Sequence, residues 1–300
     1  MEINRVNTRI IPFRFEYHSP SSLGEALTIL SRYGSEARIL AGGTDLLVDM
    51  KQRLIEPRHL VDIKRIPELK LLGGDAGGFM IGSAVRLREL ERSEAIKGRL
   101  PLLHEAISSM GSVQVRNMAT LGGNLCRASP SADAAVALLA LEAEALIAGP
   151  TGTKKVPLEG FFLGPRATLL RPDEILTGVY VPYPPEGAGS AFIKLGRTSL
   201  DLAIVNIAVV LKLRGGIVEH CRIAMGAVAP KPLRLRNIES FLSGRGLTPE
   251  ALEEALGMVE ASIKPITDIR ATADYRREVS KVLLRDAIKT AVERCGGLGS

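Results

Sequence analysis

Two glycine pairs are the part of this sequence best suited to chemistry. The first lies in ILAGGTDLL, from Ile39, and the second in TLGGNL, from Thr120. A backbone without Cβ atoms can approach a phosphate closely, and consecutive N–H groups in a tight turn form an anion-binding concavity. Thr44 and Thr120 would add hydroxyl donors. Two such turns would suit a ligand that carries two phosphates.

Taken alone, either glycine pair can also be read as an ordinary structural turn. Neither stretch completes G-x-G-x-x-G, and the sequence has no G-x-x-x-x-G-K-[ST], so a Rossmann or P-loop site finds no support here. In the first stretch the turn follows a predicted strand and opens a predicted helix, whose N-terminal partial charge would favour an anion. We expect the second stretch to follow a strand in the same way.

The other reactive side chains are scattered. The cysteines are Cys126, Cys221 and Cys295. They form no C-x-x-C pair, so we expect no disulfide framework, metal cluster or iron–sulfur centre in this chain. Cys126 directly follows the second glycine pair and is interpreted as a small buried hydrophobe. His59, His104 and His220 are isolated from one another and are interpreted as structural or exposed, so no catalytic residue and no metal ligand is predicted.

The two glycine pairs must be held by the elements around them, which hydrophobic periodicity predicts. The first helix has Ser21 or Ser22 as N-cap and Gly34 as its end. After it we expect a strand at 37–40, a helix at 46–53, a strand at 59–63, a hairpin at 69–85, one or two helices within 87–111 broken at Pro101, and a helix followed by a strand within 131–148. Strands and helices alternate, which indicates an α+β or α/β domain.

The composition changes at VPYPPEGAGS, residues 181–190, which is interpreted as a link between domains. Beyond it come strand-like segments with a hairpin at Gly215 and Gly216. Three helical segments then follow, at NIESFLSG, TPEALEEALGMVEASI and ADYRREVSKVLLRDAIKTAVERC. We expect a small second domain whose sheet is covered by helices on one face.

Composition excludes several classes of protein. The 300 residues are 46% hydrophobic and 24% charged with no Trp, which is typical of a soluble globular protein of about two domains. No apolar run approaches the ~20 residues of a membrane span, and the N-terminus does not resemble a signal peptide, so a cytoplasmic location is expected. The net charge of +6 is scattered, so no nucleic-acid partner is expected.

Four stretches resemble, in order, the FAD-binding medium subunit of the molybdenum hydroxylases, the group of xanthine dehydrogenase, carbon monoxide dehydrogenase and aldehyde oxidoreductases. They are ILAGGTDLL, MGSVQVRNMATLGGNLCRASPSADAAVALLAL, AFIKLGRTSLDLAIVNIAV and DIRATADYRREV. The resemblance covers essentially the whole chain. It implies an α+β architecture: a two-subdomain FAD-binding fold of the vanillyl-alcohol oxidase and MurB type at 1–185, with subdomains at about 1–58 and 59–185, and a small α/β C-terminal domain at 186–300.

The resemblance also assigns residues to the cofactor. In relatives the first glycine stretch cradles the FAD pyrophosphate, which here maps to Ile39, Leu40, Ala41, Gly42, Gly43, Thr44, Asp45 and Leu46. The second stretch approaches the diphosphate and ribityl side, and maps to Thr120, Leu121, Gly122, Gly123 and Asn124.

Four further positions match the family more loosely. Asp133 matches an acid that bonds the ribose or adenine end of FAD, although a helix N-cap is an equal alternative for it. Leu176 matches a position by the adenine and Lys194 a position by the flavin, where its charge would stabilise the anionic reduced ring. Met110 stands where some relatives carry a Phe against the ring, and Met can also pack on an aromatic face.

The function implied by the resemblance is electron transfer. FAD would take electrons from the [2Fe–2S] clusters of a small subunit and pass them to an acceptor such as NAD, a quinone or oxygen. Hydroxylation would occur at the molybdenum cofactor of a separate large subunit. Too few cysteines are present for the extra cluster of the benzoyl-CoA reductase branch. Two alternatives stay open: a free-standing flavin reductase of the MurB type, and a scaffold subunit that has lost FAD.

Overall fold

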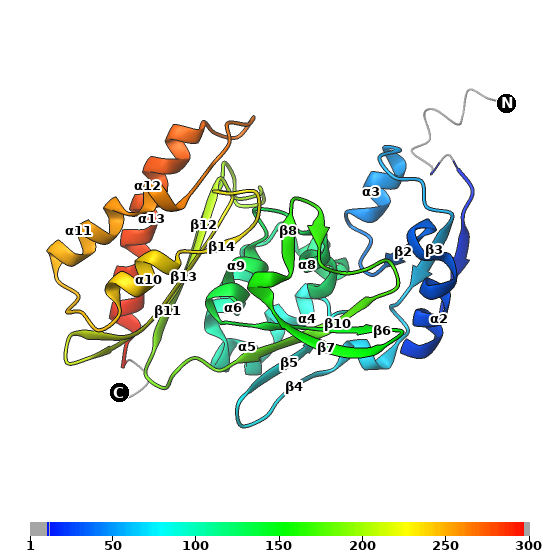
Figure 1. Ribbon diagram of the computed structural model, residues 1–300, viewed down its shortest axis with the longest axis horizontal. Coiled ribbons are helices and arrows are strands. Elements are labelled where there is room, and N and C mark those ends of the chain that lie inside the picture. Colours follow the sequence, from blue (N-terminus) through cyan, green and yellow to red (C-terminus); the bar gives the residue numbers. More distant parts are fainter. Residues whose placement is uncertain (1–10, 12, 297–300) are drawn as a thin grey trace.

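The structure, a computed structural model, describes residues 11 and 13–296, and its strands form three larger sheets and one small two-stranded sheet, β8-β9 (Figure 1). The strands are β1 (Glu16–His18), β2 (Ala37–Leu40), β3 (His59–Asp62), β4 (Leu72–Gly74), β5 (Gly78–Gly82), β6 (Glu144–Gly149), β7 (Gly152–Pro157), β8 (Phe162–Gly164), β9 (Ala167–Thr168), β10 (Ile175–Pro182), β11 (Gly189–Leu195), β12 (Val205–Arg214), β13 (Ile217–Gly226) and β14 (Leu233–Arg234). The α-helices are α2 (Leu23–Tyr33), α3 (Leu46–Lys51), α4 (Leu87–Arg92), α5 (Glu94–Arg99), α6 (Pro101–Ser108), α7 (Val113–Met118), α8 (Leu121–Arg127), α9 (Asp133–Ala140), α10 (Arg236–Leu242), α11 (Pro249–Gly257), α12 (Val259–Ser262) and α13 (Ala273–Arg294). The predicted mixed α+β fold is confirmed.

The N-terminal sheet has the order β1-β3-β2, and all its pairs are parallel. Because side chains alternate along a strand, Val61 of β3 faces α2 while Leu60 faces α3. Helix α2 begins at Ser22, one of the two predicted N-caps, whose side chain accepts a hydrogen bond from the Glu25 N–H, and it ends at Gly34, as predicted. This unit lies at the opposite end of the molecule from α11 to α13 (Figure 1).

The middle sheet has the order β4-β5-β10-β6-β7 and is antiparallel throughout. Helices α4, α5, α6, α8 and α9 contribute to the largest apolar cluster, here called the main core, which includes Ile81, Leu103, Leu138 and Val179, and α7 packs on α4. The stretch predicted as one or two helices at 87–111 contains three. Ser93 ends α4 and caps α5, because its side chain accepts a hydrogen bond from the Ile96 N–H, and Pro101 then opens α6.

The C-terminal sheet, β11-β12-β13-β14, is covered on both faces rather than on one. Its Ile207 and Ile223 face α10 and α13 in a second apolar cluster, here called the C-terminal core. The alternate residues Ala208, Val210 and Ala224 belong to the main core beside α9. The expectation of a single covered face was wrong because small apolar side chains on the second face contact helices from the preceding part of the chain.

None of the helices in the described part of the chain combines the length and the apolar character needed to cross a membrane.

Candidate functional site

The first glycine pair forms the turn between β2 and α3, as predicted. Leu40 and Leu46 anchor the two ends of this turn in an apolar cluster with Met50. Gly43 has a φ of +75°, a left-handed conformation that suits glycine. The backbone N–H groups of residues 42–45 have no acceptor among the residues described. Four successive free donors therefore line one turn, which is the arrangement that binds an anion.

This turn lies directly against the chain that leads into the second glycine pair. A Cβ atom placed on Gly42 would be 2.3 Å from the carbonyl oxygen of Met118 and 2.7 Å from the Cα of Ala119. A Cβ placed on Gly123 would be 4.0 Å from the Cβ of Ala41. The fold thus brings the two glycine stretches together, although they are far apart in the sequence.

The second glycine pair is not a strand-to-turn connection as expected. Helix α7 precedes it, and Gly122 and Gly123 lie in the first turn of α8. Thr120 is the N-cap, because its hydroxyl accepts a hydrogen bond of 3.1 Å from the Gly123 N–H. The N–H groups of Leu121 and Gly122 donate to the carbonyl oxygens of Val85 and Ser83. Since Thr120 is only 3% exposed, its hydroxyl caps the helix and does not face outward.

What the second stretch offers instead is open space and an unpaired amide. Gly123 is exposed and has no side chain to block an approaching ligand. The side-chain oxygen of Asn124 is buried and has no hydrogen-bond partner among the described residues, and the same holds for the Ser83 hydroxyl. A buried polar atom without a partner is costly, so it indicates a group that the protein chain does not itself supply.

These features fit the predicted FAD. The free N–H groups of residues 42–45 suit its pyrophosphate, the uncovered Gly123 lets the cofactor approach the backbone, and Asn124 offers a polar atom beside it. Ile39 and Ala41, which flank Leu40, pack their side chains against the apolar cluster that contains α2.

The side chains of Asp133 and Lys194 form an ion pair with each other. The Lys194 ammonium lies 2.8 Å from one carboxylate oxygen of Asp133, and Asn206 donates to the other. Asp133 is 4% exposed, and this burial raises the pKa of its carboxyl, an effect that Lys194 and Asn206 oppose. The N-cap interpretation was wrong: Ala132 is the cap of α9, and the Asp133 side chain makes no capping bond.

Lys194 and Arg116 hold the segment around Met110 from two sides. The Lys194 ammonium donates to the Ser109 carbonyl at 2.9 Å. Arg116, which lies in the QVRN motif, donates to the carbonyl oxygens of Met110 and Gly111 at 2.7 and 3.1 Å. Met110 itself is half-buried against the main core. The loop that carries Met110 is therefore fixed through its backbone.

Leu176 is 3% exposed and belongs to the main core. It precedes an irregularity in β10 at Thr177, whose carbonyl accepts from the Ser83 N–H at 2.9 Å. The Ser83 carbonyl oxygen in turn accepts a hydrogen bond of 2.9 Å from the Gly122 N–H. This chain of bonds connects Leu176 to the second glycine stretch through two backbone steps.

An ion-paired group that was not predicted from the sequence joins the two stretches. Arg127, at the end of α8, bonds the buried carboxylate of Asp49 on α3 and lies 3.4 Å from Asp45. The hydrogen bond from Arg127 holds the pKa of the Asp49 carboxyl below its ordinary value. Cys126, beside it, is exposed, so its interpretation as a buried hydrophobe was wrong. The spacing of residues along the sequence does not predict the ion pairs of Arg127, since its partners Asp45 and Asp49 lie at α3, far away in the sequence.

Two protein families match this chain in succession. The family described as "FAD binding domain in molybdopterin dehydrogenase" matches residues 13–184, and "CO dehydrogenase flavoprotein C-terminal domain" matches residues 190–291. The carbon monoxide dehydrogenase medium chain of Hydrogenophaga pseudoflava is 40% identical over 95% of this chain and 100% of the relative. The xanthine dehydrogenase FAD-binding subunit of Escherichia coli O157:H7 is 33% identical over 94% of this chain and 97% of the relative.

Solved structures show the same similarity. The carbon monoxide dehydrogenase from Hydrogenophaga pseudoflava that lacks the Mo-pyranopterin moiety matches with a TM-score of 0.93 at 40% identity, over 95% of this chain and 100% of that chain. Quinoline 2-oxidoreductase from Pseudomonas putida 86 matches with a TM-score of 0.89 at 29% identity, over 94% and 98%. This chain therefore belongs to the family of FAD-binding medium subunits of the molybdenum hydroxylases, which are oxidoreductases.

Proposed function

We propose that this chain holds one FAD across its two glycine stretches and works as the electron-transfer subunit of a molybdenum hydroxylase complex. The cofactor, when bound, supplies the capacity to receive electrons from the [2Fe–2S] clusters of a small subunit and to pass them to NAD, a quinone or oxygen. The observation that carries this proposal is the row of four free N–H groups at residues 42–45, set against the uncovered Gly123.

In this proposal each part of the site has its own task. The N–H groups of residues 42–45 bind the pyrophosphate, and Gly123 and Asn124 of α8 line the other side of the pyrophosphate. Lys194 and Arg116 position the loop at Met110, which would lie against the flavin ring. Asp133 acts as a positioning residue, because both its carboxylate oxygens are already bonded within the protein.

The partners follow from the relatives. Similar chains are named medium chain or FAD-binding subunit, which implies a large subunit with the molybdenum cofactor and a small subunit with the [2Fe–2S] clusters. We propose the same assembly here, in the cytoplasm. We also place the boundary between the two domains near residue 185, in the segment between β10 and β11, which the end of one family match and the start of the next support.

The first test is the amount of FAD that the purified chain binds. We expect flavin absorption bands and one FAD per chain, identified after release by heat. Gly123→Ala adds a methyl group beside the turn, 3.0 Å from the Thr120 hydroxyl that caps α8. We expect it to weaken FAD affinity at least tenfold, about 1.4 kcal/mol, and urea unfolding of the variant separates this from a loss of stability. Gly98→Ala is the matched control, since a Cβ there meets nothing within 4 Å, and it should leave FAD affinity unchanged.

The second test concerns the route of the electrons. The complex with its two partner subunits is reduced anaerobically and then mixed separately with NAD⁺, a quinone or oxygen while the flavin absorbance is followed. Rapid reoxidation by one of the three identifies the acceptor. A complex of Gly123→Ala that lacks FAD and still reduces the same acceptor at the wild-type rate would contradict the proposed route.

A further inference from the structure

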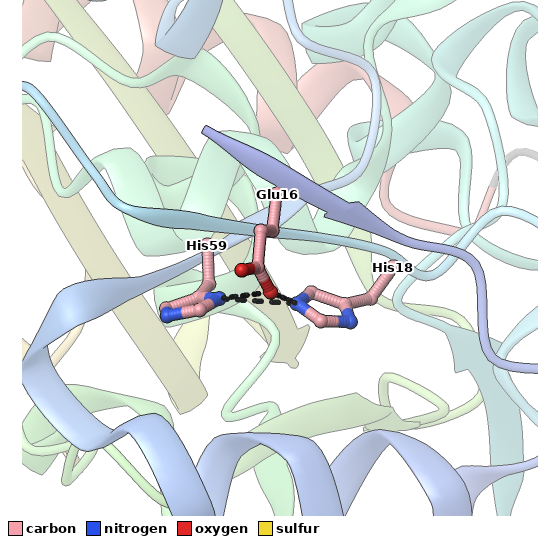
Figure 2. Close-up of side chains that lie close together, drawn as sticks. All are labelled: Glu16, His18 and His59. Carbon is pink, nitrogen blue, oxygen red and sulfur yellow. Dashed lines mark hydrogen bonds and ion pairs between the residues drawn. The ribbon is translucent and has the colours of Figure 1, made fainter. Parts of the chain in front are cut away.

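Three side chains far from the glycine stretches converge on one face of the N-terminal sheet. Figure 2 shows Glu16 and His18 on β1 directed toward His59 on β3. Glu16 and His18 are two residues apart, so they lie on the same face of their strand. The parallel register places Glu16 opposite His59. The FAD site described above uses none of these three residues.

The potential ligand atoms are spaced as a metal ion would require. His18 Nε2 lies 3.2 Å from His59 Nδ1, and the nearer carboxylate oxygen of Glu16 lies 3.4 Å from His59 Nδ1 and 3.9 Å from His18 Nε2. Bonds of about 2.0–2.2 Å from Zn²⁺ to N and O donors, in tetrahedral geometry, separate the ligand atoms by about 3.3–3.6 Å. An ion can therefore be placed between the three atoms with small adjustments of the side chains.

Packing fixes the two imidazoles but leaves the carboxylate free to adjust. The ring of His59 stacks on Tyr33 of α2, with centroids 3.5 Å apart and planes 17° apart. The side chain of His59 is 10% exposed and that of His18 is 21% exposed, whereas that of Glu16 is 69% exposed. The site is thus built on two positioned nitrogen donors and is open to solvent on the side of Glu16.

We propose that Glu16, His18 and His59 form a binding site for a divalent transition metal ion such as Zn²⁺. Two imidazole nitrogens and one carboxylate oxygen are donors that Zn²⁺ prefers, and three protein ligands leave its fourth position for water or an added ligand. Metal binding uses the lone pairs of His18 Nε2 and His59 Nδ1, so each neutral imidazole would carry its one proton on the other ring nitrogen.

The consequence of binding is a cross-link between β1 and β3. Strand β1 has three residues and, among the strands of the described residues, pairs with β3 alone, at the edge of the sheet. A metal ion bound to both strands adds its binding energy to the folded state and so stabilises the N-terminal sheet. The same sheet ends at Leu40, one residue before the cofactor-binding turn.

The test is a titration of the tag-free, EDTA-treated full chain with Zn²⁺ by calorimetry, and with Co²⁺ by visible absorption. We expect one ion per chain with a dissociation constant in the micromolar range or below, and Co²⁺ bands typical of tetrahedral coordination. His18→Gln, His59→Gln and Glu16→Gln should each weaken Zn²⁺ binding at least tenfold. The Glu16 side chain is exposed, so Glu16→Gln should fold normally. It therefore tests the site even if a histidine variant fails to fold.

Two control variants remove other donors. His220→Gln removes a histidine of β13, and Cys126→Ser removes the exposed thiol; both should bind Zn²⁺ as the wild type does. At equal Zn²⁺ concentration, the rise in melting temperature should be smaller for Glu16→Gln than for the wild type. The proposal is overturned if the wild type takes up no stoichiometric Zn²⁺, or if the three ligand variants bind it with unchanged affinity. FAD content is measured in parallel and is independent of this result.

Discussion

The buried pair of Asp133 and Lys194 shows how single residues hold this molecule together. It joins the first residue of α9 to β11, and Asn206 of β12 completes the carboxylate's hydrogen bonds. Both residues were predicted as members of one site, because each lies in a motif of the family. Their bond to each other could not be predicted, since their separation in the sequence carries no information about distance in space.

We expect Asp133→Asn and Lys194→Met to destabilise the protein strongly as single variants. Each leaves the partner charge buried without compensation, which costs about 3–5 kcal/mol. The double variant removes both charges and should recover part of that loss. Urea unfolding of the four proteins measures the cycle. Losses that simply add in the double variant would show that the two groups do not interact. Lys281→Met, from an exposed pair with Glu278, is the control and should cost less than about 1 kcal/mol.

At the scale of elements, Arg127 fastens α8 to α3 and so keeps the two glycine stretches in place. Arg127→Met removes the main partner of Asp49, which is 6% exposed. We expect the pKa of Asp49 to rise, the free energy of unfolding to fall by about 1–3 kcal/mol, and FAD affinity to fall with it. Arg285→Met, which loses an exposed pair with Glu253, is the matched control for both measurements. Unchanged FAD affinity in Arg127→Met would show that the contact is not needed for the cofactor.

The Asp268 carboxylate holds the start of α13 through Arg276, and its ionisation should change the free energy of unfolding with pH. Burial alone would raise the pKa of Asp268, but hydrogen bonds from the Arg270 N–H and the Arg276 guanidinium lower it to about 2. Arg276 also donates to the Ala227 carbonyl at 3.0 Å. The DIRATADYRREV motif therefore ties α13 to the end of β13.

Because the folded-state pKa of Asp268 lies below its unfolded value of 3.8, its stabilisation is present above about pH 4 and is lost as the pH falls toward 2. The difference corresponds to about 2 kcal/mol, of which about 1 kcal/mol disappears between pH 5 and pH 3. Urea unfolding at these two pH values should show that extra loss in the wild type and not in Asp268→Asn. Asp274→Asn, on the exposed surface of the same helix, should behave like the wild type.

Elements with local signals could be predicted, and those set by distant contacts could not. Residue types alone predict a cap at Ser21 or Ser22 and an end at Gly34, and the structure has the cap at Ser22, so the bounds of α2 were predicted to within one residue. Thr120 carries an equally clear capping signal, but the glycines after it indicated a turn, because helix propensity disfavours them. Gly122 is helical here because α8 packs on Ser83 so closely that a Cβ would lie 2.5 Å from that side chain.

The molecule as a whole is joined across its proposed domain boundary. Ala208, Val210 and Ala224 of the C-terminal sheet belong to the main core, while Ile207 and Ile223 on the opposite face belong to the C-terminal core. Because both cores pack on the same sheet, unfolding of one core should destabilise the other. The composition of the link at 181–190 indicated a boundary, but it gave no sign of this shared packing, which depends on alternate residues of distant strands.

We therefore expect the two domains to unfold together. Cys221 is 2% exposed in the C-terminal core, and burial raises the pKa of its thiol to about 12, so it should react with a thiol reagent only when that core opens. In a variant that keeps Cys221 but has Ser at the other two cysteines, Ile81→Ala in the main core should cost about 2–5 kcal/mol. If opening is shared, this substitution accelerates labelling of Cys221 by the factor that the lost stability predicts, about tenfold for each 1.4 kcal/mol. Labelling that does not respond to Ile81→Ala would mean that the C-terminal core opens independently, and that the packing of Ala208 and Val210 on the main core is too weak to couple the two halves.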